Sequence, residues 1–437
     1  MENPCEKIEQ NRHSPSLLEK LANEILQKST QISSYLAANH HAQPSFDRDA
    51  PITCIPSNAP PEIRKARQDL MEGSLKAFQL ATGPSEYIPH LALGFHYLAC
   101  LRWLAYFNIF AKVPLQGSVP YEILAEEANV SETQLKAIAR MAMTHHLFCE
   151  TEPNHIAHTA TSALFVTNPE THDWAMFMSE KSASCASKIL EASVKWPKSL
   201  AKNNTAFNVA YGTDKPFFEW LDTQPSEREQ FAKYMRMIQQ SEGMSLSHLV
   251  DGFDWASLGK ATVVDVGGST GAASIALAKS FPDLNFIVQD LSGNTKSGAA
   301  SLNEPSLAGR ILFQEHNFFD IQPFNGADVY LLRMIIHDWQ LEDAVKILQQ
   351  LLPALKKGSR IVIMDIVLPT PGTIPTVQEG LLRARDLTML QSFNSTERDI
   401  TEWTALVKKA DPNLQIINIV QPVGSIMAVL EIVWEHS

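Results

Sequence analysis

Hydrophobic and polar positions follow two different patterns, which meet near Lys260. Beyond this point, short and nearly continuous apolar runs alternate with stretches of helical periodicity. The runs are Thr262–Val266, Leu284–Gln289, Arg310–Gln314, Asp328–Leu332 and Arg360–Ile366. Such strands, separated by helices, are typical of a parallel sheet covered on both faces. The last two runs, Leu414–Val420 and Ser425–Trp434, are joined by a link so short that they must run antiparallel.

The residues before Lys260 have mainly helical periodicity. We predict helices over Leu17–Asn39, Glu62–Ala81 and Leu91–Phe110, with a proline-rich linker over His40–Pro61. The third segment is the most apolar stretch of the chain, but His96 and Arg102 interrupt it. A charge near the middle of a bilayer is costly, so we predict a buried helix there and no membrane span.

A helix-turn-helix with a small β wing is predicted next. Its helices are Pro120–Glu127 and Glu132–His145, its strands are Leu147–Cys149 and His155–His158, and Ser131 with Gln134 makes a capping box. Winged helices often bind DNA, but glutamates far outnumber Lys and Arg between Ser118 and Ala160, and the formal net charge is −12. An acidic surface disfavours phosphate binding. We therefore predict a dimerisation module without a nucleic-acid partner.

Large apolar residues are frequent in the helical stretch Thr171–Val250. Most residues of this kind form the core, and some suit an apolar pocket for a flat aromatic molecule. We predict four segments: an N-terminal helix and linker at 1–60, a winged-helix dimerisation domain at 61–165, a helical pocket region at 166–250 and the α/β domain at 251–437.

The five cysteines are scattered and form no Cys-x-x-Cys pair, which favours reduced thiols over a disulfide framework or a zinc site. No His and Cys spacing indicates another metal site. The first residues, Met1–Glu9, are polar and do not match a secretory signal or a mitochondrial presequence. We therefore predict a cytoplasmic protein that needs no metal.

A glycine-rich turn follows the first strand of the α/β domain, in the segment Val263–Gly271. A dinucleotide site requires Gly-x-Gly-x-x-Gly, but Val266 occupies the first glycine position. The remaining Asp-x-Gly-x-x-x-Gly pattern resembles the loop of class I S-adenosylmethionine (SAM) methyltransferases, with Ser269 in place of their usual middle glycine. Asp290 ends the next strand, about 20 residues beyond the turn, where an acid binds ribose hydroxyls.

A second motif, His337–Asp338–Trp339, follows the strand Asp328–Leu332, at the edge of the sheet where ligands bind in open α/β folds. With the glycine turn, Lys357–Gly358–Ser359 and Arg385–Asp386–Leu387, this motif resembles the plant and fungal small-molecule O-methyltransferases of the caffeate and fungal polyketide type. The resemblance spans roughly Leu91 to Trp434. It implies a Rossmann-like methyltransferase domain preceded by a helical dimerisation domain, SAM as cofactor and a homodimer.

The resemblance also implies roles for single residues. The residues expected to bind SAM are Asp265, Gly267, Gly268, Asp290, Asn317, Phe318 and Arg333, the last in place of a usual lysine. His337 matches the catalytic base, and Asp365 and Glu397 match two acids that orient its imidazole, although the first is usually a glutamate. Phe207 and Tyr211 resemble a stretch that lines the acceptor pocket, where core packing is an equally good interpretation.

Together these observations predict metal-independent methylation of a phenolic hydroxyl of an aromatic secondary metabolite of the polyketide type. A phenol has a pKa of about 10, so its attack on a methyl group needs a base, and histidine suits that task. Two alternatives remain open. The first is a SAM-binding pericyclase, since some fungal pericyclases resemble this family. The second is a non-enzymatic winged-helix regulator.

Overall fold

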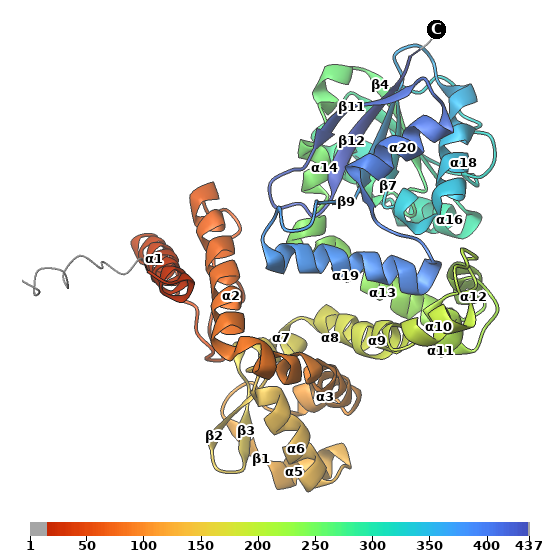
Figure 1. The fold of residues 1–437 in the computed structure, drawn as a ribbon. Helices are drawn as coiled ribbons and strands as arrows, with labels where there is room; N and C mark the ends of the chain where they lie inside the picture. Colours follow the sequence, from red (N-terminus) through yellow and green to blue (C-terminus); the bar gives the residue numbers. More distant parts are fainter. Residues whose placement is uncertain (1–14, 436–437) are drawn as a thin grey trace, which may run out of the picture. The chain divides into compact units, whose positions relative to one another are not determined.

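The structure, a computed structural model, describes residues 15–435 and divides into two compact units (Figure 1). The N-terminal unit contains the residues up to Glu180 and the short segment Ile374–Gln378. The C-terminal unit contains Lys181–Thr373 and the residues from Glu379 onward. The segment Met1–Glu9, for which we predict no leader sequence, lies outside the described residues.

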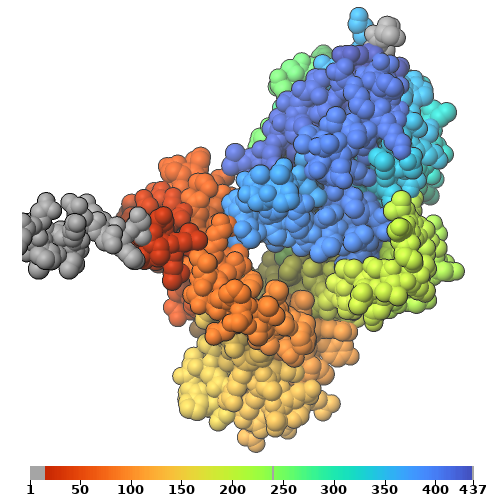
Figure 2. Space-filling model, viewed as in Figure 1, coloured from red at the N-terminus to blue at the C-terminus, as the bar shows by residue number. Residues whose placement is uncertain are grey.

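Two long helices, α1 (Leu17–Ala38) and α2 (Pro61–Ala92), open the N-terminal unit. α1 begins with a capping box formed by Ser16 and Glu19, which satisfies backbone N–H groups of its first turn. The two helices pack along each other, as their dark red and orange atoms show in Figure 2, around a small apolar core that includes Ile32 and Leu36. The helices predicted in this region are therefore confirmed.

The prediction of one helix over Leu91–Phe110 is wrong. The segment is divided into the end of α2, α3 (Gly94–Tyr106) and the short α4 (Ile109–Lys112). The last break falls at Asn108, whose left-handed φ of 56° ends regular helical geometry. The segment is also only partly buried, because Leu91 and Phe95 are 69% and 65% exposed.

Helices and short strands lie close to the positions predicted for the helix-turn-helix and its wing, and the winged-helix dimerisation module stays a prediction. These elements are α5 (Tyr121–Ala128), α6 (Glu132–Met143) and the antiparallel strands β2 (Cys149–Glu152) and β3 (His155–Ala157), with a third strand, β1 (Ser118–Pro120), paired to β3. Ser131 caps α6 by accepting a hydrogen bond from the Gln134 backbone, but the reciprocal bond of the predicted capping box is absent from α6. Two helices, α7 (Ala160–Thr167) and α8 (Pro169–Met176), follow.

The C-terminal unit begins with short helices and then forms the sheet. The helices are α9 (Ala183–Ala186), α10 (Ile189–Lys195), α11 (Ala206–Tyr211), α12 (Phe217–Asp222), α13 (Pro225–Gln240) and α14 (Ser247–Asp251). The sheet strands are β4 (Ala261–Val266), β5 (Leu284–Asp290), β6 (Ile311–Glu315), β7 (Val329–Arg333), β8 (Arg360–Asp365), β11 (Leu414–Val420) and β12 (Ala428–Trp434).

The sheet has the order β11-β12-β8-β7-β4-β5-β6. The strands from β4 to β8 are parallel, whereas β12 runs antiparallel to both β8 and β11. The parallel sheet closed by a C-terminal hairpin is therefore confirmed. Side chains of a strand alternate between the two faces, so Val264 and Asp265 point in opposite directions.

Helices cover both faces of this sheet (Figure 1). Val264 and Tyr330 belong to a core shared with α18 (Leu341–Leu351) and α20 (Ile400–Ala410). On the other face lie α14 and α15 (Ala272–Ser280), followed by α16 (Ser292–Ser301) and α17 (Pro305–Ala308). α18 ends at Leu351, because Pro353 has no N–H to continue the helical ladder.

The remaining element of the C-terminal unit is a small parallel pair, β9 (Val367–Leu368) with β10 (Arg398–Asp399). Between them the chain forms α19 (Thr376–Phe393). This pair brings the residues just before β10 next to the end of β8. Among residues 15–435, no helix has the length and hydropathy that a membrane crossing requires.

Candidate active site

The site lies at the edge of the sheet where the parallel strands end. The turn after β4, the last residue of β5 and the segments after β7 and β8 all meet there, because parallel strands share one carboxyl edge. The sequence interpretation placed the glycine turn and His337 at this edge, and the structure confirms that placement.

The backbone geometry of the turn after β4 explains why it contains glycines. Gly267 and Gly268 donate hydrogen bonds to the carbonyl of Gln289 on β5, at 2.8 and 3.0 Å. Gly267 has a φ of 74°, and a Cβ there would lie 2.5 Å from Ile335. A Cβ on Gly268 would lie 2.6 Å from the Asp265 carboxyl carbon. The turn therefore tolerates only glycine at both positions, which leaves the backbone bare for a close ligand.

Asp265, the last charged residue of β4, supports this turn from inside. Its side chain is buried and accepts a hydrogen bond of 2.7 Å from the Ser274 hydroxyl on α15. Burial raises the pKa of Asp265 to about 6, against the opposing effects of Ser274 and the Arg333 charge. Asp265 therefore packs against the backbone of the glycine turn and supports its conformation.

Asp290 holds the other side of the turn. One of its carboxylate oxygens accepts from the Ser269 N–H at 2.8 Å, and the other accepts from Leu291 N and Asn294 Nδ2, both at 2.7 Å. A carboxylate offers about four acceptor positions, so one remains for a further donor. Ser269 has a φ of 52°, and its bond to Asp290 stabilises this left-handed conformation.

Asn317 and Phe318, predicted to bind SAM, follow β6. The Phe318 ring lies 3.6 Å from the Cβ position of Gly267 and packs edge-on against Trp339. The Asn317 side chain accepts from the Phe319 N–H at 3.1 Å and is exposed. Phe318 is therefore beside the glycine turn, and the bare turn, the acid at Asp290 and this aromatic ring fit the parts of SAM.

Arg333, at the end of β7, lies half-buried beneath the same edge. Its Nη2 donates to the Met244 carbonyl at 2.8 Å, and its buried Nε has no partner among residues 15–435. Burial lowers the pKa of Arg333, and the charges of Asp265 and Asp365 oppose that shift. The guanidinium therefore interacts electrostatically with Asp265, which supports the glycine turn, and with Asp365 on β8.

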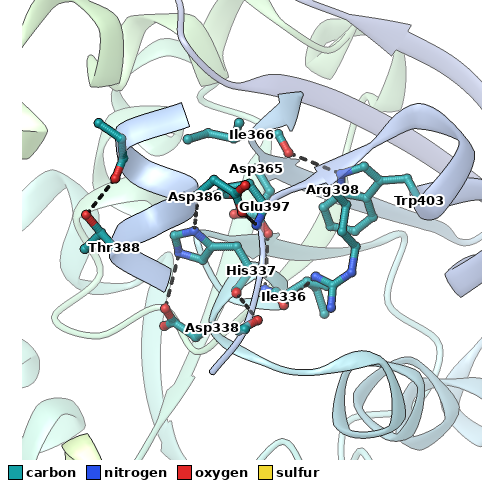
Figure 3. A network of polar contacts seen from close by, with 12 residues as sticks. Ile336, His337, Asp338, Asp365, Ile366, Asp386, Thr388, Glu397, Arg398 and Trp403 are labelled. Carbon is teal, nitrogen blue, oxygen red and sulfur yellow. Dashed lines mark hydrogen bonds and ion pairs between the residues drawn. The ribbon is translucent and has the colours of Figure 1, made fainter. Parts of the chain in front are cut away.

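His337 lies in the short 3₁₀ turn Ile336–Asp338 after β7, and its ring is 8% exposed. Its Nδ1 donates to the Glu397 carboxylate at 2.9 Å, and its Nε2 faces Asp338 (Figure 3). Ile335, two residues earlier, is the side chain nearest to the Cβ position of Gly267. The turn that carries His337 is therefore adjacent to the glycine turn.

The environment of His337 is strongly acidic. Burial lowers its pKa, but the charges of Glu397, Asp338 and Asp365 more than offset this effect and raise the pKa to about 10. Asp338 Oδ1 lies 3.6 Å from Nε2. The imidazole is therefore protonated at neutral pH in the ligand-free protein.

Asp365 has a different position from the one that the sequence interpretation implied. Its Oδ2 accepts from the Ile336 N–H at 3.2 Å, and its Oδ1 is buried without a partner. It makes no hydrogen bond to the imidazole and acts on it through charge alone. Burial raises the pKa of Asp365 to about 7, because desolvation outweighs the attraction of His337. The acid directly bonded to the ring is Glu397.

The sequence interpretation missed several residues around His337. Asp338 faces Nε2, and Asp386 accepts from the Glu397 backbone at 2.9 Å. Ser395 donates to the His337 carbonyl at 2.7 Å, and Arg398 lies beside the same turn. Asp338 adjoins His337 in the sequence, but nothing there shows which way its side chain points, and Asp386, Ser395 and Arg398 come from segments far from His337 in the chain.

Phe207 and Tyr211 lie on α11 within an aromatic cluster. The Phe207 ring is fully buried, 4.9 Å from Tyr211 and 5.2 Å from both Phe217 and Trp220, measured between ring centroids. Phe207 thus has the packing of a core residue, whereas Tyr211 is half-buried. Their assignment to an acceptor pocket stays a prediction.

Metal binding has no support in the described part of the chain. Within residues 15–435, no cluster of three or more His, Cys, Asp or Glu side chains has a geometry that suits a metal ion. The predicted independence from metal stays a prediction.

The fold and the site define a Rossmann-like methyltransferase. Comparison with known proteins gives the family: the O-methyltransferase domain matches residues 194–411. The chain is 48% identical to O-methyltransferase VdtC of Byssochlamys spectabilis, over 95% of this chain and 98% of that protein. The chain belongs to this O-methyltransferase family, and SAM is its methyl donor. The alternative of a non-enzymatic regulator is therefore wrong.

Solved structures show the same fold at low sequence identity. OxaC is 21% identical with a TM-score of 0.76, over 96% of this chain and 99% of that one. LepI, solved in complex with SAM, is 23% identical with a TM-score of 0.71, over 95% of this chain and all of that one. Both similarities extend over both units.

Proposed function

We propose that this enzyme methylates a phenolic hydroxyl of an aromatic secondary metabolite of the polyketide type, with His337 as the general base. The observation that carries the proposal is the buried His337–Glu397 pair, 2.9 Å apart, next to the glycine turn. Its Nε2 is the nitrogen that can take a proton from an acceptor. Relatives with high identity along nearly the whole chain are fungal O-methyltransferases, which supports a fungal small molecule as acceptor.

The proposed chemistry depends on the acidity of the acceptor. A phenol has a pKa of about 10, so its neutral form is a poor nucleophile. Once neutral, a histidine whose pKa is also about 10 accepts the phenolic proton at almost no free-energy cost, but at neutral pH only a small fraction of His337 is in that form. Glu397 keeps the proton on Nδ1 and stabilises the imidazolium that forms.

The residues around the glycine turn would hold the cofactor. Gly267 and Gly268 offer bare backbone, Asp290 a free acceptor position for ribose hydroxyls, and Phe318 an aromatic face for the adenine. When bound, SAM supplies a methyl group on a sulfonium, which an oxygen displaces in line. The positive charge of Arg333 would compensate the negative charges of the buried Asp265 and Asp365 beneath this site.

A panel of phenolic aglycones incubated with SAM tests the proposed reaction. We expect S-adenosylhomocysteine and a methylated product with at least one phenol, and none with the corresponding methyl ethers, in which the hydroxyl is already blocked. Methylation of amines or aliphatic alcohols alone would contradict a phenolic acceptor. Rearrangement of an added polyene without S-adenosylhomocysteine would instead support a pericyclase, the alternative that the sequence leaves open.

The pH dependence of kcat/KM provides a second test. Only neutral His337 acts as a base, and its raised pKa keeps it protonated below about 10. We therefore expect kcat/KM to rise with pH throughout the neutral range instead of reaching a plateau near 6.5. Asp338→Asn removes one charge that raises this pKa and should shift the acidic limb to lower pH. An acidic limb at the same pH in both proteins would contradict the assignment.

The predicted homodimer also stays a proposal, which exposed apolar side chains of α2 and α3 support. These side chains are Phe78, Leu80, Ile88, Leu91, Leu93, Phe95 and Leu98. Such a surface is typical of contacts between subunits. Light scattering at micromolar concentration should give twice the mass of one chain, and Leu91→Glu with Phe95→Glu should reduce it to one. A monomeric wild-type protein would contradict this prediction.

A further inference from the structure

The turn that carries His337 is held by one short segment, Ser395–Arg398 (Figure 3). Ser395 donates to the His337 carbonyl at 2.7 Å. The Arg398 guanidinium donates from Nη1 to the Ile336 carbonyl at 3.1 Å and from Nη2 to the Trp339 carbonyl at 2.5 Å. Carbonyls before, at and after the histidine are therefore all bound by this segment, which also supplies Glu397.

We propose that Arg398 is a positioning residue for methyl transfer: its guanidinium fixes the turn so that Nε2 of His337 points at the acceptor while Nδ1 stays bonded to Glu397. The inference rests on the proposed role of His337 as base. It adds a residue that touches neither acceptor nor cofactor and acts through the backbone of the base.

The geometry favours arginine specifically at this position. Its planar fork binds two carbonyls that flank the histidine, which a single ammonium group cannot do with the same orientation. The fork is itself fixed, because Arg398 pairs with Val367 in the β9–β10 ladder and its guanidinium lies 5.7 Å from the Trp403 ring centroid. Trp403 in turn donates to the Ile366 carbonyl at 3.2 Å. The guanidinium therefore cannot follow a displaced turn.

The charge of Arg398 has a second effect. The acids around His337 come from four segments: Asp338 in its own turn, Asp365 on β8, Asp386 on α19 and Glu397 before β10. The cations that offset them are Arg398, which also interacts with Glu402 of α20, and Arg333 on β7. Burial lowers the pKa of Arg398, and the charges of Asp365 and Glu397 oppose that shift. Loss of this cation should make His337 harder to deprotonate.

Two substitutions separate the two effects. Arg398→Lys keeps the charge but loses the fork, so we expect kcat to fall by about 10- to 100-fold with an unchanged acidic limb of the pH profile. Arg398→Gln loses both, so the same limb should also shift to higher pH. The Kd for SAM and the KM for the acceptor should stay at the wild-type values in both variants.

Arg310→Lys is the matched control. The Arg310 guanidinium also binds backbone carbonyls, those of Ala278, Phe281 and Leu284, but no contact joins it to His337. The control should lose thermal stability without a change in kcat or pH profile. Wild-type kcat in both Arg398 variants would overturn the inference, and so would a loss of kcat accompanied by an equal loss of SAM affinity, which indicates a merely structural role. Retained activity in His337→Ala would refute the base itself.

Discussion

Replacing His337 by alanine is expected to lower kcat by about 10²- to 10⁴-fold, the contribution typical of a general base. The reason is that Nε2 is the proposed proton acceptor, whereas Glu397 is bonded to the other ring nitrogen. The affinity for SAM should be unchanged, since the groups at the glycine turn do not depend on the imidazole. Isothermal titration with SAM and steady-state kinetics with a phenol measure the two quantities.

His248→Ala is the matched control for this experiment. His248 lies in the same unit, is equally buried at 8% exposure, and bonds only a backbone carbonyl, that of Glu242 at 2.7 Å. Its removal also creates a cavity but leaves the site intact, so kcat should stay close to the wild-type value. Equal losses of activity in the two variants would mean that His337 supports the fold and not the reaction.

The sheet could be predicted from the sequence because its signals are local. Each strand is an apolar run, and the link around Pro422–Gly424 is too short for anything but an antiparallel hairpin. The glycine turn was equally visible, because a backbone with positive φ and no space for Cβ requires glycine. Placing His337 at the same edge needed only the rule that parallel strands end together.

The partners of His337 could not be predicted in the same way. Glu397 and Arg398 are 60 residues or more from the turn, and only the β9–β10 pair brings them there. The family pattern suggested Asp365 as a second partner of the ring. Its shorter side chain ends at the Ile336 backbone instead, and Asp338 lies beside Nε2. Which acid contacts the imidazole depends on how the segments pack in three dimensions, and the spacing of residues in the sequence does not show this.

The broken helix after Leu91 has a similar cause. Its composition is largely apolar, so periodicity alone continues the helix to Phe110. Instead, Asn108 has a left-handed backbone conformation. Asparagine tolerates this conformation, but the presence of an asparagine does not by itself predict it. β1, at Ser118–Pro120, was missed because three residues are too few to show alternation.

Asp290→Asn is expected to raise the Kd for SAM by about 10- to 100-fold, because hydrogen bonds to a charged group contribute about 1.5–3 kcal/mol. The carboxylate accepts from Ser269, Leu291 and Asn294 and keeps one position for a ribose hydroxyl. An amide has one carbonyl oxygen, so it cannot serve all these donors. The loss of the bond to Ser269 also releases the left-handed turn.

Asp328→Asn controls for the removal of a carboxylate from the same sheet. Asp328 likewise accepts from a backbone N–H, that of Thr262 at 2.8 Å, but it precedes β7 at the opposite edge. This variant should bind SAM with wild-type affinity, and titration calorimetry compares the two. If Asp290→Asn binds SAM as tightly as Asp328→Asn does, the ribose contact must come from another residue, and the site must be displaced from the end of β5.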